Sequence, residues 1–185
     1  MSDDFIYIPN FLSNEMQQTL FNYLESTGDF IPTYQYTDNI SRYQKWYQTD
    51  MKYFCPVWKQ RFPHWESFQM DDTIKNLIDM IKQSNIVNIN INSCLINKYP
   101  NGNHFISPHR DSPDSFGEEP VIIVLSIGDM RTLLFENNMK KFSYDLESGS
   151  IFIMRGQSQK EYLHSIPKSD SMNVRYSFTF REFIL

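Results

Sequence analysis

The first half of the chain contains one short apolar run and two segments in which apolar residues recur at helical spacing. Residues 5–8 are apolar or aromatic and predict a short strand. Apolar residues recur every three or four positions after Ser13 or Asn14, so a helix is expected to begin there and to end at Gly28. The same spacing, with acidic residues at its start, predicts a second helix over residues 71–83. Both helices are expected to pack on a sheet.

From Ile86 onward the hydrophobic period changes to two. The alternation between Ile86 and Leu95 predicts one long strand with a rather polar face. Many short strands after two helices favour an α+β, mainly β fold, and the double-sheet jelly-roll is the natural interpretation. The length of 185 residues fits a single domain, residues 1–185. Further strands are expected at residues 121–127, 131–135, 150–154 and 174–181.

The last of these strands has a polar face. Alternation places Arg175, Ser177 and Arg181 on that face, with apolar side chains opposite. Solvent could satisfy both arginines, but guanidinium groups bind carboxylates in bidentate fashion and keep their charge when buried, so a dicarboxylate is the better partner. The two arginines stand about 20 Å apart along an ideal strand, so both reach one small ligand only by leaning inward.

Charge and composition narrow the possible settings. The formal net charge of −5 does not fit a protein that binds duplex nucleic acid mainly by neutralising phosphates. The absence of a signal-like N-terminus and of a long apolar stretch predicts an intracellular protein, in the cytoplasm or nucleus, that is neither secreted nor in a membrane. Cys55 and Cys94 are too few for a disulfide framework, and Cys94 is expected to be buried.

Two histidines and an aspartate form a candidate metal site. His109 and Asp111 stand two residues apart at a strand end, which puts both side chains on one side. With His164 from another strand they complete a two-histidine, one-carboxylate facial set that suits Fe(II) and leaves three coordination positions open. His104 is five residues before His109 and is expected to face the other way, and His64 is also not expected to be a ligand.

The context of this set resembles the AlkB family of Fe(II)- and 2-oxoglutarate-dependent dioxygenases. The chain carries the family's N-x-Y before H-x-D, its S-x-G strand followed by an arginine, its H-S-x-P and its arginine-rich close. The resemblance is dense over residues 86–183 and loose before them. It implies a double-stranded β-helix with N-terminal supporting helices, and Fe(II), 2-oxoglutarate and O2 as cofactor and co-substrates. The motifs lie at residues 97–99, 126–131, 164–167 and 175–181.

The resemblance also implies roles for the polar strand residues. Asn97 and Tyr99 would donate hydrogen bonds to 2-oxoglutarate, and Arg175 would clamp one of its carboxylates. Arg181 would assist at the other end or brace the metal-ligand aspartate. Ser177 stands where the family usually has Asn, so its contact with the co-substrate is a departure from the pattern.

An aromatic segment resembles the family's nucleotide-recognition lid, here about residues 30–70. Stacking on aromatic side chains contributes about 1–3 kcal/mol per base in single-strand binders, and a flipped base needs such partners. Arg131 is expected to orient the site or approach the target base, with an exposed strand charge as the alternative. The candidates for stacking are Trp46, Tyr47, Tyr53 and Phe54.

The implied activity is oxidative dealkylation of N-alkylated bases in DNA or RNA, releasing formaldehyde, succinate and CO2. Alkylated nucleic acid, single-stranded by preference, is the expected partner of a monomeric enzyme. Pro113 departs from the family, whose DNA-repair members commonly carry an acidic residue there. The alternatives are a related dioxygenase acting on a protein side chain or a small molecule, and an inactive binding module.

Overall fold

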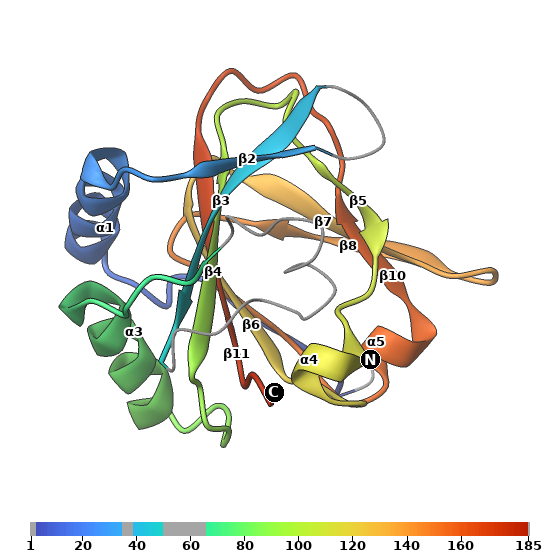
Figure 1. The fold of residues 1–185 in the computed structure, drawn as a ribbon. Coiled ribbons are helices and arrows are strands. Elements are labelled where there is room, and N and C mark those ends of the chain that lie inside the picture. Colours follow the sequence, from blue (N-terminus) through green and yellow to red (C-terminus); the bar gives the residue numbers. More distant parts are fainter. Residues whose placement is uncertain (1–2, 35–38, 50–65, 185) are drawn as a thin grey trace.

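The fold consists of two antiparallel sheets that face each other (Figure 1). The computed structural model describes residues 3–34, 39–49 and 66–184. The smaller sheet has the order β5 (Ile106–His109), β10 (Leu163–Ile166), β7 (Arg131–Glu136), β8 (Lys141–Leu146). The larger sheet has the order β1 (Phe5–Ile8), β9 (Ile151–Met154), β6 (Ile122–Gly128), β11 (Arg175–Arg181), β4 (Ser93–Tyr99), β3 (Ile40–Gln48), β2 (Ile31–Tyr34).

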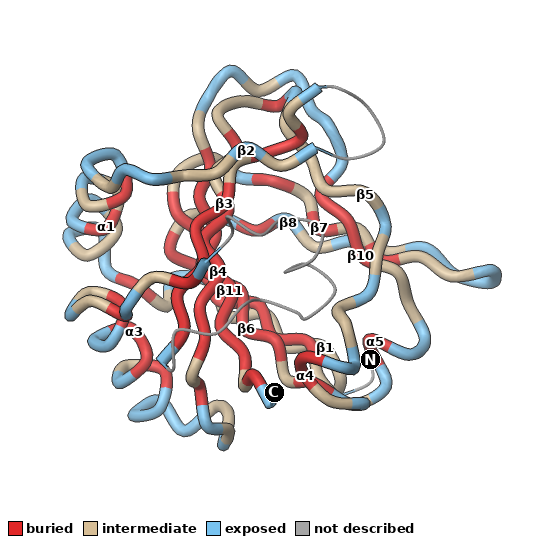
Figure 2. Tube along the Cα trace, in the orientation of Figure 1, coloured by how far each residue is buried: buried red, intermediate tan, exposed pale blue. Residues whose placement is uncertain are grey.

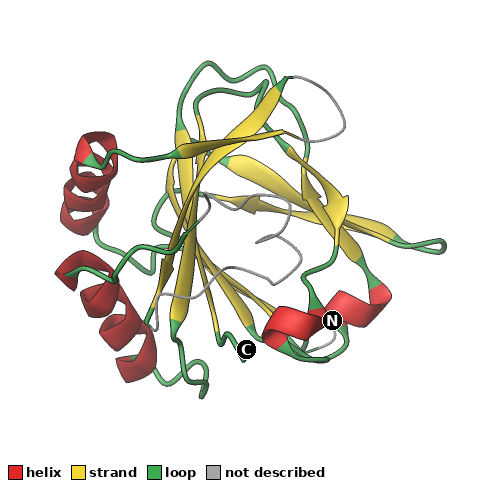
Figure 3. Cartoon of the chain, in the orientation of Figure 1, coloured by secondary structure: helices red, strands yellow, loops and turns green. Residues whose placement is uncertain are grey.

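Two helices cover the outer face of the larger sheet (Figures 1 and 3). Helix α1 (Asn14–Ser26) begins after Ser13, whose hydroxyl accepts a hydrogen bond from the Met16 amide. Helix α3 (Asp72–Gln83) begins after Asp71, which caps it in the same way. Both predicted helices are thus confirmed. No helix in the described part of the chain is long and apolar enough to span a membrane.

The alternation in β11 divides its side chains between an apolar face and a polar face. Tyr176, Phe178 and Phe180 pack with the two helices in the outer core, whereas the opposite face looks toward the smaller sheet. A second core, with Phe135 at its centre, fills the space between the sheets. The inner strands β9, β6, β11, β4 and β3 are buried over most of their length, whereas the edge strands β1 and β2 are only partly buried (Figure 2). The predicted jelly-roll and the predicted polarity of the last strand are confirmed.

One sequence prediction was wrong in detail. The strand expected from Ile86 begins only at Ser93, and Val87 and Ile89 pack against the helical core from an irregular segment. Within the segment expected to form the lid, residues 31–34 and 40–48 are strands at one edge of the larger sheet, and the lid itself stays a prediction. Residues 50–65 lie outside the described residues.

Two helical turns that the sequence did not predict flank the metal-binding motif. Helix α4 (Pro113–Phe116) follows it directly, and helix α5 (Ser158–Glu161) precedes β10. The Ile184 amide donates a hydrogen bond to the carbonyl oxygen of Ser115, and the Phe116 and Phe183 rings pack edge to face. These contacts fix the segment after β5 against the C-terminal end of the larger sheet.

Candidate active site

The smaller sheet brings the three predicted metal ligands together. His109 ends β5 and is paired directly with His164 of β10, and their rings lie 4.2 Å apart. Asp111 follows two residues after the end of β5. One possible ligand atom from each of the three residues lies within 4.8 Å of the others. This grouping is the facial arrangement that the sequence predicted.

Hydrogen bonding fixes which nitrogen of His109 is available. Its Nδ1 lies 2.8 Å from the main-chain carbonyl of Ser107, which can only accept, so Nδ1 carries the proton and Nε2 keeps its lone pair. Burial lowers the pKa of His109, and burial together with His109 lowers the pKa of His164 to about 3. Both imidazoles are therefore neutral near pH 7, as metal ligation requires.

Asp111 is held from two sides. Arg181 donates from Nε to Oδ2 at 2.6 Å, and the Asp111 amide donates to Oε1 of Gln159 in α5. Burial alone raises the pKa of this carboxyl, but its interactions with Arg181, His164 and His109 together outweigh that effect and the pKa lies below its usual value. The aspartate is thus ionised and oriented before any metal binds. Arg181 takes the bracing role, one of the two roles expected for it.

Arg175 is a buried cation without an acidic partner among the described residues. Only 1% of the residue is exposed. Its Nη2 donates to the Ser126 hydroxyl at 3.0 Å, whereas Nε and Nη1 have no hydrogen-bond partner among the described residues. Such donors are costly to bury unpaired, so the arrangement calls for an anion that supplies two acceptor atoms.

The other expected co-substrate residues surround Arg175. Tyr99 pairs with it across β4 and β11, and the Tyr99 ring lies 5.2 Å from its guanidinium. Asn97 and Ser177 form the next pair on the same face. The structure therefore gathers the predicted residues on one face of the larger sheet, opposite the smaller sheet that carries the two histidines.

The residues present fit Fe(II) and 2-oxoglutarate. Two neutral imidazoles and one ionised carboxylate are donors that Fe(II) accepts. His164 has a buried Nδ1 with no partner among the described residues, and Arg175 has two such atoms. A bound metal ion and the carboxylate of a bound co-substrate would supply the partners that these polar atoms of His164 and Arg175 lack.

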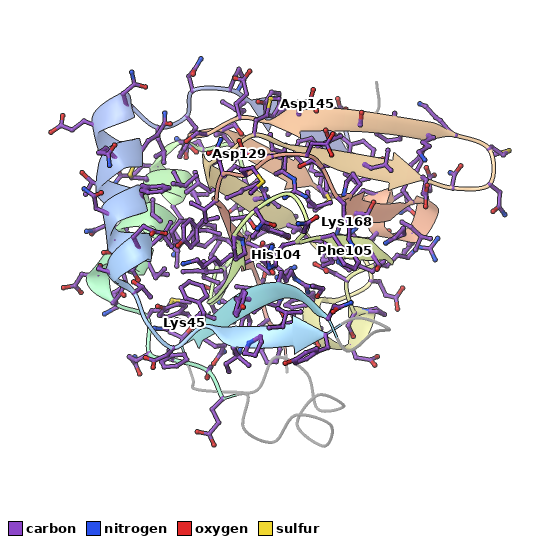
Figure 4. The ribbon with its side chains drawn as sticks, turned by 90° about the horizontal axis from the view of Figure 1, so that it is seen from above. Lys45, His104, Phe105, Asp129, Asp145 and Lys168 are labelled. Atoms are coloured by element: carbon purple, nitrogen blue, oxygen red, sulfur yellow. The ribbon has the colours of Figure 1, made fainter. Side chains whose placement is uncertain are left out.

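His104 lies outside the metal site, as expected. It belongs to the loop between β4 and β5, where its Nδ1 lies 3.0 Å from the Asn101 side-chain oxygen. Figure 4 places it beside Phe105 and Lys168, and the Lys168 ammonium lies 5.1 Å from the Phe105 ring. His64 lies outside the described residues.

Arg131 is hydrogen-bonded to two loops. Its guanidinium donates to the carbonyl oxygens of Asn101, His104 and Pro167, which joins the β4–β5 loop to the end of β10. These bonds and the burial of the side chain favour the first of its two predicted roles, which is to orient the site. The expected approach to the target base is not supported by this geometry.

Two of the four predicted stacking residues are in the wrong place. Tyr47 is 3% exposed and packs in the outer core, on the face of the sheet that looks away from the metal ligands. Trp46 is on the metal-side face but only 1% exposed, packed against Leu95, Phe116 and Phe183. Neither ring is free to stack on a base. Tyr53 and Phe54 lie outside the described residues, so their role stays a prediction.

Sequence reasoning missed three polar residues of the site. Gln159 contacts Asp111, and Arg42 and Gln44 of β3 both contact Asn97. Arg42 and Gln44 could have been found from their alternation with Tyr43 and Lys45, which marks a polar face of a strand. Gln159 carries no comparable signal, because it enters through a single turn of helix.

Comparison with known proteins agrees with this geometry. A model of the 2OG-Fe(II) oxygenase superfamily matches residues 4–181. The chain belongs to this superfamily. It is 25% identical over 212 aligned positions to "DNA oxidative demethylase ALKBH2" of Arabidopsis thaliana, an alignment covering 96% of this chain and 66% of the relative. It is 28% identical over 152 positions to "Alpha-ketoglutarate-dependent dioxygenase alkB homolog 3" of Homo sapiens, covering 76% and 51%.

These relatives confirm the resemblance to the AlkB family within the oxygenase superfamily. The superfamily uses Fe(II), 2-oxoglutarate and O2, which matches the ligand set and the buried arginine. The solved structure described as "The structure of OsALKBH1" has a TM-score of 0.71 at 16% identity, covers 98% of this chain and 99% of its own, and shows the same fold. The chain spans 66% of the length of the Arabidopsis relative and 51% of the length of the human one.

Proposed function

We propose that this oxygenase removes alkyl groups from alkylated bases of nucleic acid by oxidation. The carrying observation is the facial set of His109, Asp111 and His164 opposite a buried arginine with two unpartnered donors. The curated relatives are a DNA demethylase and an AlkB homologue, which supports a nucleic-acid substrate. Hydroxylation of an N-methyl carbon produces an unstable adduct that releases formaldehyde and leaves the bare nitrogen.

Each part of the site has a separate task. Fe(II), with 2-oxoglutarate and O2, supplies the oxidation of a C–H bond when bound. His109, Asp111 and His164 would hold the metal on one side, and Arg181 keeps the carboxylate ligand ionised. Arg175 would bind a carboxylate of the co-substrate, with Asn97 donating to it as well. His109 has 29% of its side chain exposed, which leaves the metal approachable from its side.

The surface charges support a single-stranded substrate. Five lysines of the described chain are within 4 Å of a carboxylate, and the whole chain has a net charge of −5, so little phosphate neutralisation is available. Extracting a base from a duplex costs a few kcal/mol that an unpaired strand does not require. A monomer fits the exposed large apolar side chains of the described residues, which are scattered over the end of β2 and separate turns and loops. They are Tyr34, Met130, Met139, Met172 and Ile184.

A screen of methylated DNA and RNA oligonucleotides, single- and double-stranded, tests the proposal. Mass spectrometry should detect loss of a methyl group, with equimolar formaldehyde and succinate, and only with Fe(II) and 2-oxoglutarate. Succinate formation stimulated by a peptide or small molecule and not by any oligonucleotide would instead indicate the related dioxygenase class. Absence of succinate under all conditions would indicate a binding module.

A further inference from the structure

A row of polar side chains crosses the larger sheet beneath the proposed co-substrate site. Gln44 of β3 is paired with Asn97 of β4, Asn97 with Ser177 of β11, and Ser177 with Ser126 of β6. All four are buried. A buried polar row in the middle of a sheet is stable only when each group finds a partner, so its hydrogen-bond directions can be worked out.

Arg42 determines the orientation of the Asn97 side-chain amide. Its Nε donates to Asn97 at 3.0 Å, and a guanidinium has no acceptor, so the atom that receives this bond must be the Asn97 oxygen, Oδ1. The same oxygen lies 2.8 Å from Gln44 Nε2. Oδ1 therefore accepts two bonds, and both lone pairs of this oxygen are occupied.

Gln44 is oriented in turn by β2. The Thr33 hydroxyl donates to Gln44 Oε1 at 2.7 Å, which leaves only the amino group of Gln44 to face Asn97. The Thr33 carbonyl itself accepts from the Ser41 hydroxyl, which ties this corner of β2 to β3. The direction of the chain of bonds is thus fixed from Thr33 through Gln44 to Asn97.

The remaining group of Asn97 is a donor without a partner. Among the described residues, the hydrogen bonds of its side chain go to Oδ1 and none is made by Nδ2, which is not fully enclosed by those residues. It shares its sheet face with Arg175, whose Nε and Nη1 also lack partners among the described residues. Unpaired donors on one face favour a ligand that has only acceptors there, as a carboxylate does.

We propose that Arg42 and Gln44 are positioning residues that hold Asn97 with its Nδ2 directed to 2-oxoglutarate. This inference rests on the co-substrate site of the proposed function and adds to it a reason for the direction of the Asn97 amide. A freely rotating asparagine would present its oxygen to the carboxylate part of the time and repel it. The donors of Arg42 and Gln44 on β3 exclude the orientation in which the Asn97 oxygen faces the ligand.

Gln44→Glu tests the proposal because it reverses one bond. A carboxylate at position 44 accepts where glutamine donated, so it attracts Asn97 Nδ2 away from the ligand. Calorimetric titration of 2-oxoglutarate into anaerobic protein with Mn(II) should show an affinity about tenfold weaker, the effect of about one charged hydrogen bond. The Mn(II) affinity should stay unchanged. In turnover assays the KM for 2-oxoglutarate should rise while that for the oligonucleotide does not.

A double-variant cycle distinguishes positioning from simple repulsion by the new charge. In the Asn97→Ala background, Gln44→Glu should weaken 2-oxoglutarate binding by less than about twofold, because the residue through which it acts is gone. The same tenfold loss in both backgrounds would overturn the proposal, as would no loss in the wild-type background.

Gln44→Met serves where Gln44→Glu does not fold. It keeps the shape and removes the donor without adding charge, and a loss of about threefold is expected because Arg42 still holds Oδ1. Tyr43→Phe, on the opposite face of β3, is the matched control and should bind 2-oxoglutarate as the wild type does. Failure of the wild type to bind 2-oxoglutarate would refute the co-substrate site, whereas binding without oligonucleotide turnover would refute only the proposed substrate.

Discussion

Arg181 donates from Nε to Oδ2 of Asp111 at 2.6 Å, and at least 94% of each side chain is buried. The guanidinium also lies 4.8 Å from the Phe116 ring. A buried ion pair costs desolvation of both charges, so its net contribution to stability is small while both partners are present. Removing one partner leaves the other charge buried and unpaired.

We therefore expect Arg181→Met to lower the free energy of unfolding of the metal-free protein by about 3–5 kcal/mol. Asp111→Asn added to Arg181→Met should recover most of that loss, because no buried charge is then left. Urea unfolding with a chelator present measures both. A loss of under about 1 kcal/mol for Arg181→Met would mean that the pair behaves like an exposed one.

The metal ligands give a second prediction. His109→Ala, Asp111→Ala and His164→Ala should each reduce turnover to the background without enzyme and abolish Fe(II) binding, since each removes one corner of the ligand face. Anaerobic Fe(II) titration and circular dichroism separate loss of metal from loss of fold. His104→Ala is the control and should keep both turnover and Fe(II) binding. Loss of metal binding in His104→Ala with His164→Ala unaffected would refute the assignment.

Arg175 provides a test of the co-substrate site. Arg175→Lys keeps the charge but loses the two-pronged geometry, so the KM for 2-oxoglutarate should rise about tenfold or more. The KM for the oligonucleotide should stay within about twofold, because the buried face of β11 does not reach the surface. Ser126→Ala removes only one partner of Arg175 and should have the smaller effect. An unchanged KM for 2-oxoglutarate with weaker oligonucleotide binding would contradict the role.

Strand preference is the fourth prediction. The same methylated sequence should react faster as a single strand than in a duplex, and the logarithm of the binding constant should fall with that of salt concentration at a slope no steeper than about −2. Competition kinetics at two salt concentrations measure both quantities. A duplex preference with a steep slope would show that basic groups gather on a surface for which the described ion pairs give no indication.

The metal ligands could be predicted from sequence because their placement depends on local geometry. Side chains two residues apart along an extended chain share a side, and this was enough to place His109 and Asp111 together even though β5 ends at His109. The spacing of Arg175 and Arg181 similarly showed that both could not easily reach one ligand. The structure assigns them two different partners, in agreement with that argument.

The failures depended on which face of a sheet meets the metal. Trp46 and Tyr47 are neighbours on β3 and therefore point to opposite faces, so at most one could have contacted a base. The aromatic content of the segment suggested exposure, but neighbouring strands and helices bury both rings. The prediction of a strand from Ile86 was wrong for a related reason, because alternation alone does not show whether a partner strand is present.

Because His109 and His164 are paired directly, a metal bound to both would link strand β5, at the edge of the smaller sheet, to its neighbour β10. Strand β5 has only four residues and one neighbour, and its register with β10 is irregular. Bound metal would hold this edge closed, whereas in its absence the amides of β5 should exchange with deuterium long before those of the central β11. Fraying of β5 then gives the ion a way in and out that requires no opening of the larger sheet.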